Sequence, residues 1–262
     1  MNQLEHIMSN STGYLVDALG FETHMRQIRG MRGDSIPPEW YKRPYFYTLR
    51  LERDKMRGTG ETLRFPSFVR QKDYEFELVA MHLQSIQTTD IREAIAHVRD
   101  HMVFSIFNDC SCRDFQADDR ALALGVSASK GIADKGFGPK WAHGRDLNMD
   151  DNGVFHVGMK LVVNDAVRCE TSFDSIYFDD PETGARRNWS FAQVIAWMGR
   201  MNQGFGKGDL LGSGTVGNGA IAERHNIHPW LRHGDEIVMR VEGLGELHST
   251  VEVFDMPDPR KL

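Results

Sequence analysis

Two glutamates set two positions apart, Glu75 and Glu77, constrain this chain more than any other feature of its sequence. The stretch 73–80 around them alternates acidic with apolar residues, which is typical of a β-strand. A period of two puts both carboxylates on one face of that strand and the aromatic and aliphatic side chains on the other. Because neighbouring anions repel, a half-buried strand tolerates them mainly when a cation lies between them or when one takes up a proton. A solvated strand face is the alternative interpretation, since exposed glutamate is common.

A second acidic cluster follows at 108–116, where Asp109 lies in a polar run with Asn, Ser, Arg and Gln. Alone, Asp109 would more often be a turn or capping residue. Together with Glu75 and Glu77 it would form an all-oxygen site on two neighbouring strands. Such a site favours Mg²⁺, Mn²⁺ or Ca²⁺ over zinc or copper.

Length, charge and cysteine content narrow the class of protein. The 262 residues suffice for one large domain or two unequal ones. The net charge of -6 comes with no basic block, which gives no electrostatic footprint for nucleic acid. No apolar run reaches the roughly 18 residues of a membrane helix, and the N-terminus lacks the pattern of a signal peptide. The three cysteines, Cys110, Cys112 and Cys169, cannot pair completely and suit a reducing compartment. We therefore expect a cytoplasmic protein with neither a membrane nor a nucleic-acid partner.

Local patterns alone predict a β-rich α+β protein. Strands are expected at 74–83, 103–108, 155–163, 167–178, 208–213, 236–242 and 247–254. Helices are expected near 16–29 and after two capping boxes that begin at Asp90 and Ser190. Residues 1–70 are expected to form a small N-terminal segment, and 71–262 the catalytic domain.

Four motifs occur in an order that resembles the fumarylacetoacetate hydrolase superfamily, over roughly residues 15 to 255. They are Tyr74-Glu75-x-Glu77-Leu78, Asn108-Asp109-x-Ser111-x-Arg113-Asp114-x-Gln116, Lys130 ahead of a Gly138-Pro139-Lys140-Trp141 turn, and Gly208-Asp209-x-x-Gly212-Ser213-Gly214-Thr215. The resemblance implies a mixed β-sandwich or β-roll core with a short N-terminal segment. It also implies that Glu75, Glu77 and Asp109 bind a divalent ion, Mg²⁺ or else Mn²⁺ or Ca²⁺.

Further site residues are implied by the same resemblance. Arg113 and Gln116 match positions near the substrate, and Lys130 would face an oxyanion, with Lys135 as the competing candidate. His24 matches a histidine that activates water in relatives. Several relatives support that histidine with a glutamate three residues later, where this chain has Gln27. An amide can orient the imidazole but cannot stabilise its cation by charge.

The glycine-rich loop 212–217 matches Gly-x-Gly-x-x-Gly, yet it is followed by strands rather than by a βαβ unit. We therefore reject a dinucleotide site. A tight turn in which Gly214 and Thr215 bind a substrate carboxylate fits better. The loop histidines His225, His228 and His233 have no opposed carboxylate in the sequence and are expected to be structural.

The predicted function is metal-dependent hydrolysis of a carbon–carbon bond in a 1,3-dicarbonyl or acylpyruvate-type keto acid, through an enolate. A decarboxylase of oxaloacetate-like acids, a tautomerase or isomerase, and a dehydratase are alternatives, because they need an enolate but no attacking water. A binding protein without catalysis is a third. The expected partners are a small keto-acid substrate and, from the resemblance, a second copy in a homodimer.

Overall fold

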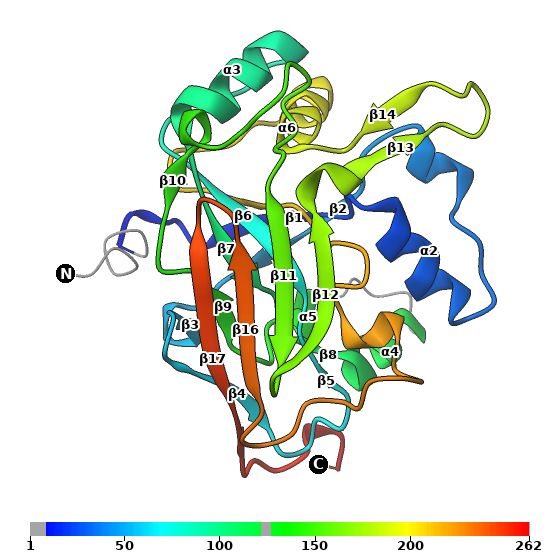
Figure 1. Cartoon of the computed structure of the whole chain (residues 1–262), viewed down its shortest axis with the longest axis vertical. Coiled ribbons are helices and arrows are strands. Elements are labelled where there is room, and N and C mark those ends of the chain that lie inside the picture. The colour runs from blue at the N-terminus through cyan, green and yellow to red at the C-terminus, as the bar shows by residue number, and fades with distance from the viewer. Residues whose placement is uncertain (1–8, 122–126, 262) are drawn as a thin grey trace.

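The computed structural model describes residues 9–121 and 127–261, and it is built on two β-sheets with helices at their edges (Figure 1). The β-rich fold expected from the superfamily is confirmed. In Figure 1 the smaller sheet lies toward the viewer, with α3 and α6 above it and α2 to its right. No helix among the described residues is long and apolar enough to cross a membrane.

The first sheet has eight strands in the order β2-β1-β15-β6-β7-β9-β3, with β10 paired to β7. Its strands are β1 (Tyr14–Ala18), β2 (Phe46–Arg50), β3 (Met56–Arg57), β6 (Phe76–His82), β7 (Met102–Asn108), β9 (Lys135–Phe137), β10 (Ala142–His143) and β15 (Leu210–Gly212). All seven residues of β6 and of β7 are buried, so the two strands that carry the acidic motifs lie inside the molecule.

The second sheet has five strands in the order β12-β11-β16-β17-β4. They are β4 (Thr62–Pro66), β11 (Gly158–Val163), β12 (Ala166–Ser172), β16 (Glu236–Val241) and β17 (Gly245–Phe254). Two small pairs complete the strands, β5 (Lys72–Asp73) with β8 (Ser111–Cys112) and β13 (Tyr177–Asp179) with β14 (Arg186–Asn188). The strand predicted over 167–178 is too long, because a 3₁₀ helix (Phe173–Ile176) follows β12.

The helices are α2 (Glu22–Gly30), α3 (Ile91–His101), α4 (Arg113–Ala121), α5 (Ser127–Lys130) and α6 (Phe191–Arg200). Asp90 caps α3 as predicted, because its carboxylate accepts a hydrogen bond from the Arg92 backbone N–H. The cap predicted for α6 is absent: Ser190 precedes the helix, but its side chain accepts no such bond. The start of α6 is therefore fixed by the burial of its apolar face.

The helix predicted near 16–29 is wrong in its first part. Residues 14–18 form β1, which pairs with β15 on one side and β2 on the other, and only Glu22–Gly30 is helical. Leu15 and Val16 are fully buried in this sheet. Pairing on both sides satisfies the backbone of β1, and such tertiary contacts outweigh a weak local helix signal.

The first 70 residues contribute strands to both sheets, since β1, β2 and β3 lie in the first and β4 pairs in parallel with β17 in the second. A domain boundary at residue 70 stays a prediction. The shared sheets mean that the entry segment takes part in the same core as the acidic motifs.

A histidine pair is buried at the end of β6. His82 has no exposed surface, its Nδ1 lies 3.0 Å from Nε2 of His97, and its ring stacks on Phe205 at 4.4 Å. Its Nε2 has no hydrogen-bond partner among the described residues. Burial, and after it the His97 ring, lowers the pKa of His82 to about 3.

This pair predicts that the fold loses stability in mild acid. An unfolded histidine has a pKa near 6.5, so at lower pH the unfolded chain takes up a proton at His82 that the folded chain refuses. The free energy of unfolding should therefore fall as the pH drops below about 6.5, by up to about 2 kcal/mol at pH 5 from this group. Chemical denaturation of the native protein and of His82→Phe at several pH values measures this. The variant should show a shallower dependence, whereas His248→Gln, at an exposed histidine, should match the native slope; parallel curves for His82→Phe would contradict the assignment.

Candidate active site

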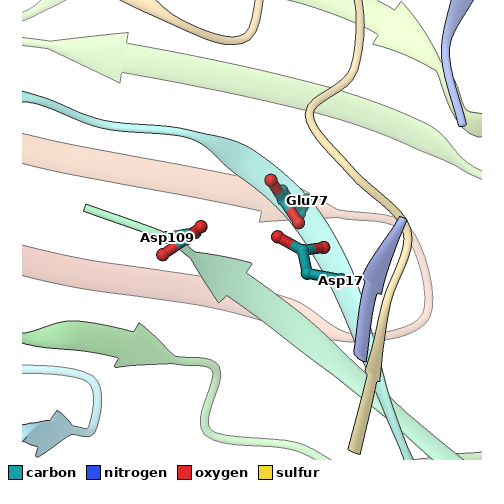
Figure 2. Close-up of side chains that lie close together, drawn as sticks. All are labelled: Asp17, Glu77 and Asp109. Atoms are coloured by element: carbon teal, nitrogen blue, oxygen red, sulfur yellow. The ribbon is translucent and has the colours of Figure 1, made fainter. Parts of the chain in front are cut away.

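Three carboxylates from distant parts of the chain meet inside the first sheet. Asp17 lies in β1, Glu77 in β6 and Asp109 directly after β7, and one ligand atom of each lies within 4.8 Å of the others. Figure 2 shows the carboxylates of Asp17 and Glu77 side by side, with Asp109 at the end of its strand. We call these three residues the acidic group.

Two members of the acidic group, Asp17 and Glu77, form no ion pair with any described residue. Burial, and after it the Asp109 carboxylate, raises the pKa of Asp17 to about 7. Burial, then Asp17 and Asp109, raises the pKa of Glu77 well above its ordinary value. Oδ1 of Asp17 and Oε2 of Glu77 have no hydrogen-bond partner within the described ranges. Converging carboxylates with free buried oxygens fit a hard divalent ion, which would remove the mutual repulsion.

Glu75 lies beside the acidic group but already has cationic partners. Its Oε1 accepts a hydrogen bond of 2.7 Å from Nη2 of Arg113, and its Oε2 accepts one of 2.8 Å from Oγ of Ser111 and one from the ammonium of Lys130. Burial alone would raise the pKa of Glu75, but Arg113 and Lys130 outweigh it and hold that pKa well below its ordinary value. Glu75 is thus an ionised anchor for two cations, and its role as a metal ligand stays a prediction.

Both candidate lysines are buried against Asp109. The Lys130 ammonium binds Oδ2 of Asp109 and lies 5.3 Å from the centre of the Tyr47 ring. Lys135 lies 2.6 Å from the other oxygen, Oδ1, and also donates to the backbone carbonyl of Cys110. Only Lys130 lines the cavity described below. Burial lowers the pKa of Lys130, but Asp109 and Glu75 more than reverse this, so its ammonium stays charged.

Two glycines, Gly212 and Gly214, leave the space that the Asp17 carboxylate and the neighbouring backbone occupy. A Cβ on Gly212 would lie 2.2 Å from Oδ1 of Asp17, so a larger residue would displace that carboxylate. Gly214 has a φ of +77° and would clash with the Ala18 carbonyl if it carried a Cβ. The loop then brings the Thr215 hydroxyl to 3.0 Å from Oε1 of Glu77. The glycine-rich loop therefore packs against the acidic group.

A histidine and a glutamate form a buried pair next to these groups. Nδ1 of His24, on α2, lies 3.0 Å from Oε1 of Glu223 in the 3₁₀ helix η5 (Ile221–Glu223). The carboxylate of Glu223 also accepts hydrogen bonds from the backbone N–H groups of Asn218 and Ala220. A carboxylate at Nδ1 assigns the proton to that nitrogen and leaves Nε2 free to act as a base. Gln27 instead donates to Asn218 at 2.7 Å.

One cavity of about 200 Å³ joins these parts. All of the predicted catalytic and substrate-binding residues line it: His24, Arg113, Gln116, Lys130, Gly214 and Thr215. Glu75, Glu77 and Asp17 line it as well, while Asp109 lies behind Lys130. Nη1 of Arg113 donates to Oε1 of Gln116 at 3.0 Å, so this neighbouring pair on α4 acts as a unit. The site that was predicted from four separated motifs is thus one continuous pocket.

Sequence reasoning missed Asp17, which lines this pocket, and Glu223, which lies against His24. Asp17 had a signal, because it is a single carboxylate within an apolar run, which is unusual in a buried strand. Glu223 had none, since its partner His24 is 199 positions away in the chain. Gln27 led us to expect that the His24 imidazole would have no carboxylate beside it, and the structure places Glu223, from another element, next to it.

Comparisons with known proteins agree with this fold. A family model described as fumarylacetoacetate (FAA) hydrolase C-terminal matches residues 14–252. An uncharacterized protein of Pyrococcus horikoshii is 24% identical over 199 residues, 76% of this chain and 74% of that protein. The structure is similar to fumarylpyruvate hydrolase from Pseudomonas aeruginosa in complex with Mn²⁺ and pyruvate, with a TM-score of 0.68, 22% identity, and coverage of 92% of this chain and 89% of that one. It is also similar to 5-carboxymethyl-2-hydroxymuconate delta-isomerase from Mycobacterium smegmatis, with a TM-score of 0.64, 18% identity, and coverage of 95% and 81%.

The acidic group predicts a divalent-ion site that depends on Asp17. After removal of metal with a chelator, Mn²⁺ titrated by calorimetry should bind Asp17→Asn at least about tenfold more weakly than the native protein. Glu170→Gln, at an exposed carboxylate of β12 paired only with Lys160, should bind as the native protein does. Native affinity in Asp17→Asn would remove Asp17 from the site. The same titration of Glu75→Gln tests the ligand set predicted from the sequence.

Proposed function

The chain belongs to the fumarylacetoacetate hydrolase family, and from this premise we propose that it hydrolyses a carbon–carbon bond in an acylpyruvate-type keto acid with the help of a divalent ion. The observation that carries the proposal is a single cavity lined by three kinds of group: the carboxylates Asp17 and Glu77, the ammonium of Lys130, and a histidine oriented by Glu223. Of the reactions that share an enolate, only hydrolysis also needs a base for water.

The donor set supports a divalent ion held by Asp17, Glu77 and Asp109. A similar protein, fumarylpyruvate hydrolase from Pseudomonas aeruginosa, is described in complex with Mn²⁺ and pyruvate, which favours the same class of ion and of keto acid. Such an ion would supply Lewis acidity toward the oxygens of the keto acid. Mg²⁺, Mn²⁺ and Ca²⁺ all suit these oxygen ligands.

Positive side chains around the cavity favour an anionic substrate. Arg113 and Lys130 lie on the inner wall and Arg32 on the outer wall. Arg32 forms no ion pair with any described residue, so its guanidinium is available to a carboxylate of the substrate. The amide of Gln116, held by Arg113, adds a polar contact. We assign Lys130 to the oxygen on which negative charge develops, because a fixed ammonium stabilises that charge without reorganisation.

The His24–Glu223 pair supplies the base. Nε2 of His24 takes a proton from water while the water oxygen bonds to the carbonyl carbon distant from the keto acid. The carbon–carbon bond between that carbon and the pyruvate part then breaks, and its electron pair remains on the pyruvate part as an enolate. Proton uptake by the enolate carbon gives pyruvate, and the distant carbonyl leaves as a carboxylic acid. Glu223 stabilises the imidazolium that forms on His24.

Lys130→Met should lower turnover by about 10² to 10³, the usual cost of losing one preorganised donor to a developing oxyanion. Binding of the substrate should weaken less than turnover falls. Steady-state kinetics on an acylpyruvate measures both quantities. Lys160→Met, at an exposed lysine paired with Glu170 on the far sheet, is the control and should keep native kinetics. A Lys130→Met enzyme with native turnover would exclude Lys130 from the reaction.

His24→Ala and Glu223→Gln test the reaction class. Both should suppress cleavage of an acylpyruvate, His24→Ala by about 10² or more, because a general base is lost or mispositioned. Deuterium exchange at the carbon next to the keto group of a bound keto acid should continue, since enolisation does not need attacking water. Gln27→Ala is the matched control, because Gln27 contacts Asn218 and not the imidazole.

A different set of rates would contradict the proposed hydrolase activity. If the native enzyme releases carbon dioxide from oxaloacetate faster than it cleaves any acylpyruvate, and His24→Ala leaves that rate unchanged, the protein is a decarboxylase. The homodimer expected from the resemblance stays a prediction that the mass of the protein in solution would test.

A further inference from the structure

A second cavity, of about 190 Å³, is lined by Tyr74, which lies between β5 and β6. It is enclosed by the tip of the β11–β12 hairpin and by the segment 221–235, which runs past that tip on its way to β16 (Figure 1). Tyr74 lines this cavity whereas its neighbour Glu75 lines the first one. The two cavities therefore have separate walls and share no lining residue.

Arginines without carboxylate partners dominate the charge of this cavity. Arg168 and Arg232 line it, and Arg224 is near enough to act on the adjacent His228. None of these three guanidinium groups forms an ion pair within residues 9–121 and 127–261. By contrast, Arg57 and Arg113 hold carboxylates at 2.8 and 2.7 Å. Unpaired arginines that line one cavity are typical of an anion-binding site.

The donors of Arg168 are arranged to receive an acceptor. Its Nε is buried and has no hydrogen-bond partner among the described residues, and a buried N–H without a partner is costly. Its Nη1 donates to Nδ1 of His228, which fixes the remaining imidazole proton on Nε2. Arg168 is thus held in place by one nitrogen while another nitrogen lacks an acceptor.

The single acidic residue that lines the cavity does not supply this acceptor. Oδ1 of Asp235 accepts from the Asn164 amide at 2.8 Å, and its Oδ2 accepts from the Arg232 backbone N–H at 2.7 Å. Both carboxylate oxygens of Asp235 are therefore already hydrogen-bonded, one to the tip of the β11–β12 hairpin and one within the segment 221–235. Trp230 and Leu231 also line the cavity. Its volume of about 190 Å³ restricts it to a compact ligand.

We propose that this cavity is a binding site for a compact oxyanion, a phosphate or a small carboxylate, held by Arg168 and Arg232. Both anions offer oxygens to guanidinium N–H donors, which is the chemistry they share. A bound oxyanion would supply the acceptor that Nε of Arg168 lacks. The site lies outside the catalytic pocket and does not depend on the reaction assigned there.

Calorimetric titration at constant ionic strength tests the site, with inorganic phosphate and acetate as separate probes. At least one probe should bind the native protein saturably. That binding should weaken by about tenfold or more in Arg168→Met, the scale of a lost charge-assisted hydrogen bond. Arg232→Met should weaken it too, and because Arg232 is exposed, this variant guards against misfolding of the first. Basal turnover should stay native in both variants.

Two further arginine variants locate the binding. Arg240→Met removes an arginine of β16 that pairs with Glu246, and Arg32→Met removes an unpaired arginine of the catalytic pocket. Neither should change the affinity of the probe. Binding of phosphate alone or of acetate alone would identify the kind of oxyanion. Absence of saturable binding for both probes, or binding that Arg32→Met weakens and Arg168→Met and Arg232→Met do not, would overturn the proposal.

Discussion

The compensation of buried negative charge is the constraint on which the rest of this structure depends. Four carboxylates lie in the first sheet or directly beside its strands and are almost entirely buried: Asp17, Glu75, Glu77 and Asp109. Charges removed from water must be paired, protonated or bound to a cation. Cationic side chains keep Glu75 ionised, whereas Asp17 and Glu77 keep free oxygens and have raised pKa values. Glu75 therefore anchors cationic side chains of the protein, whereas the acidic group is suited to a metal ion.

The same charges organise the elements around the sheet. Arg113 begins α4 and binds Asp73 at 2.7 Å as well as Glu75. Asp73 in turn accepts the backbone N–H groups of Ile221 and Ala222, which start η5. A chain of contacts therefore runs from the acidic motifs to the short helix that carries Glu223. The Glu223 that contacts His24 and the Arg113 that lines the pocket are positioned by one network, so a change at Asp73 is expected to disturb both.

How much could be predicted differs between kinds of residue. Glu75, Glu77, Arg113 and Gln116 lie in dense local motifs, and residue type with spacing sufficed to bring them to one site. Each of the seven segments predicted as strands contains one, because alternating or continuously buried runs are visible in the local sequence, whereas most of the short strands were not predicted. Residues 16–18 were assigned to a helix, because their apolar pattern is short and the strands that satisfy the backbone of β1 are distant in the chain. A local pattern holds no information about such partners.

The sequence by itself determined which chemical groups are available to this protein: carboxylates suited to a hard cation, a lysine and an arginine suited to an anion, and a β-rich core to hold them. Only the tertiary structure decided which carboxylates converge, by pairing β1 with β15 and so carrying Asp17 to Glu77. It likewise gave His24 a glutamate from the far end of the chain in place of the expected neighbour. The physical reason is that a side chain's type is encoded at its own position, whereas its distance to a partner depends on every strand pairing and turn between the two.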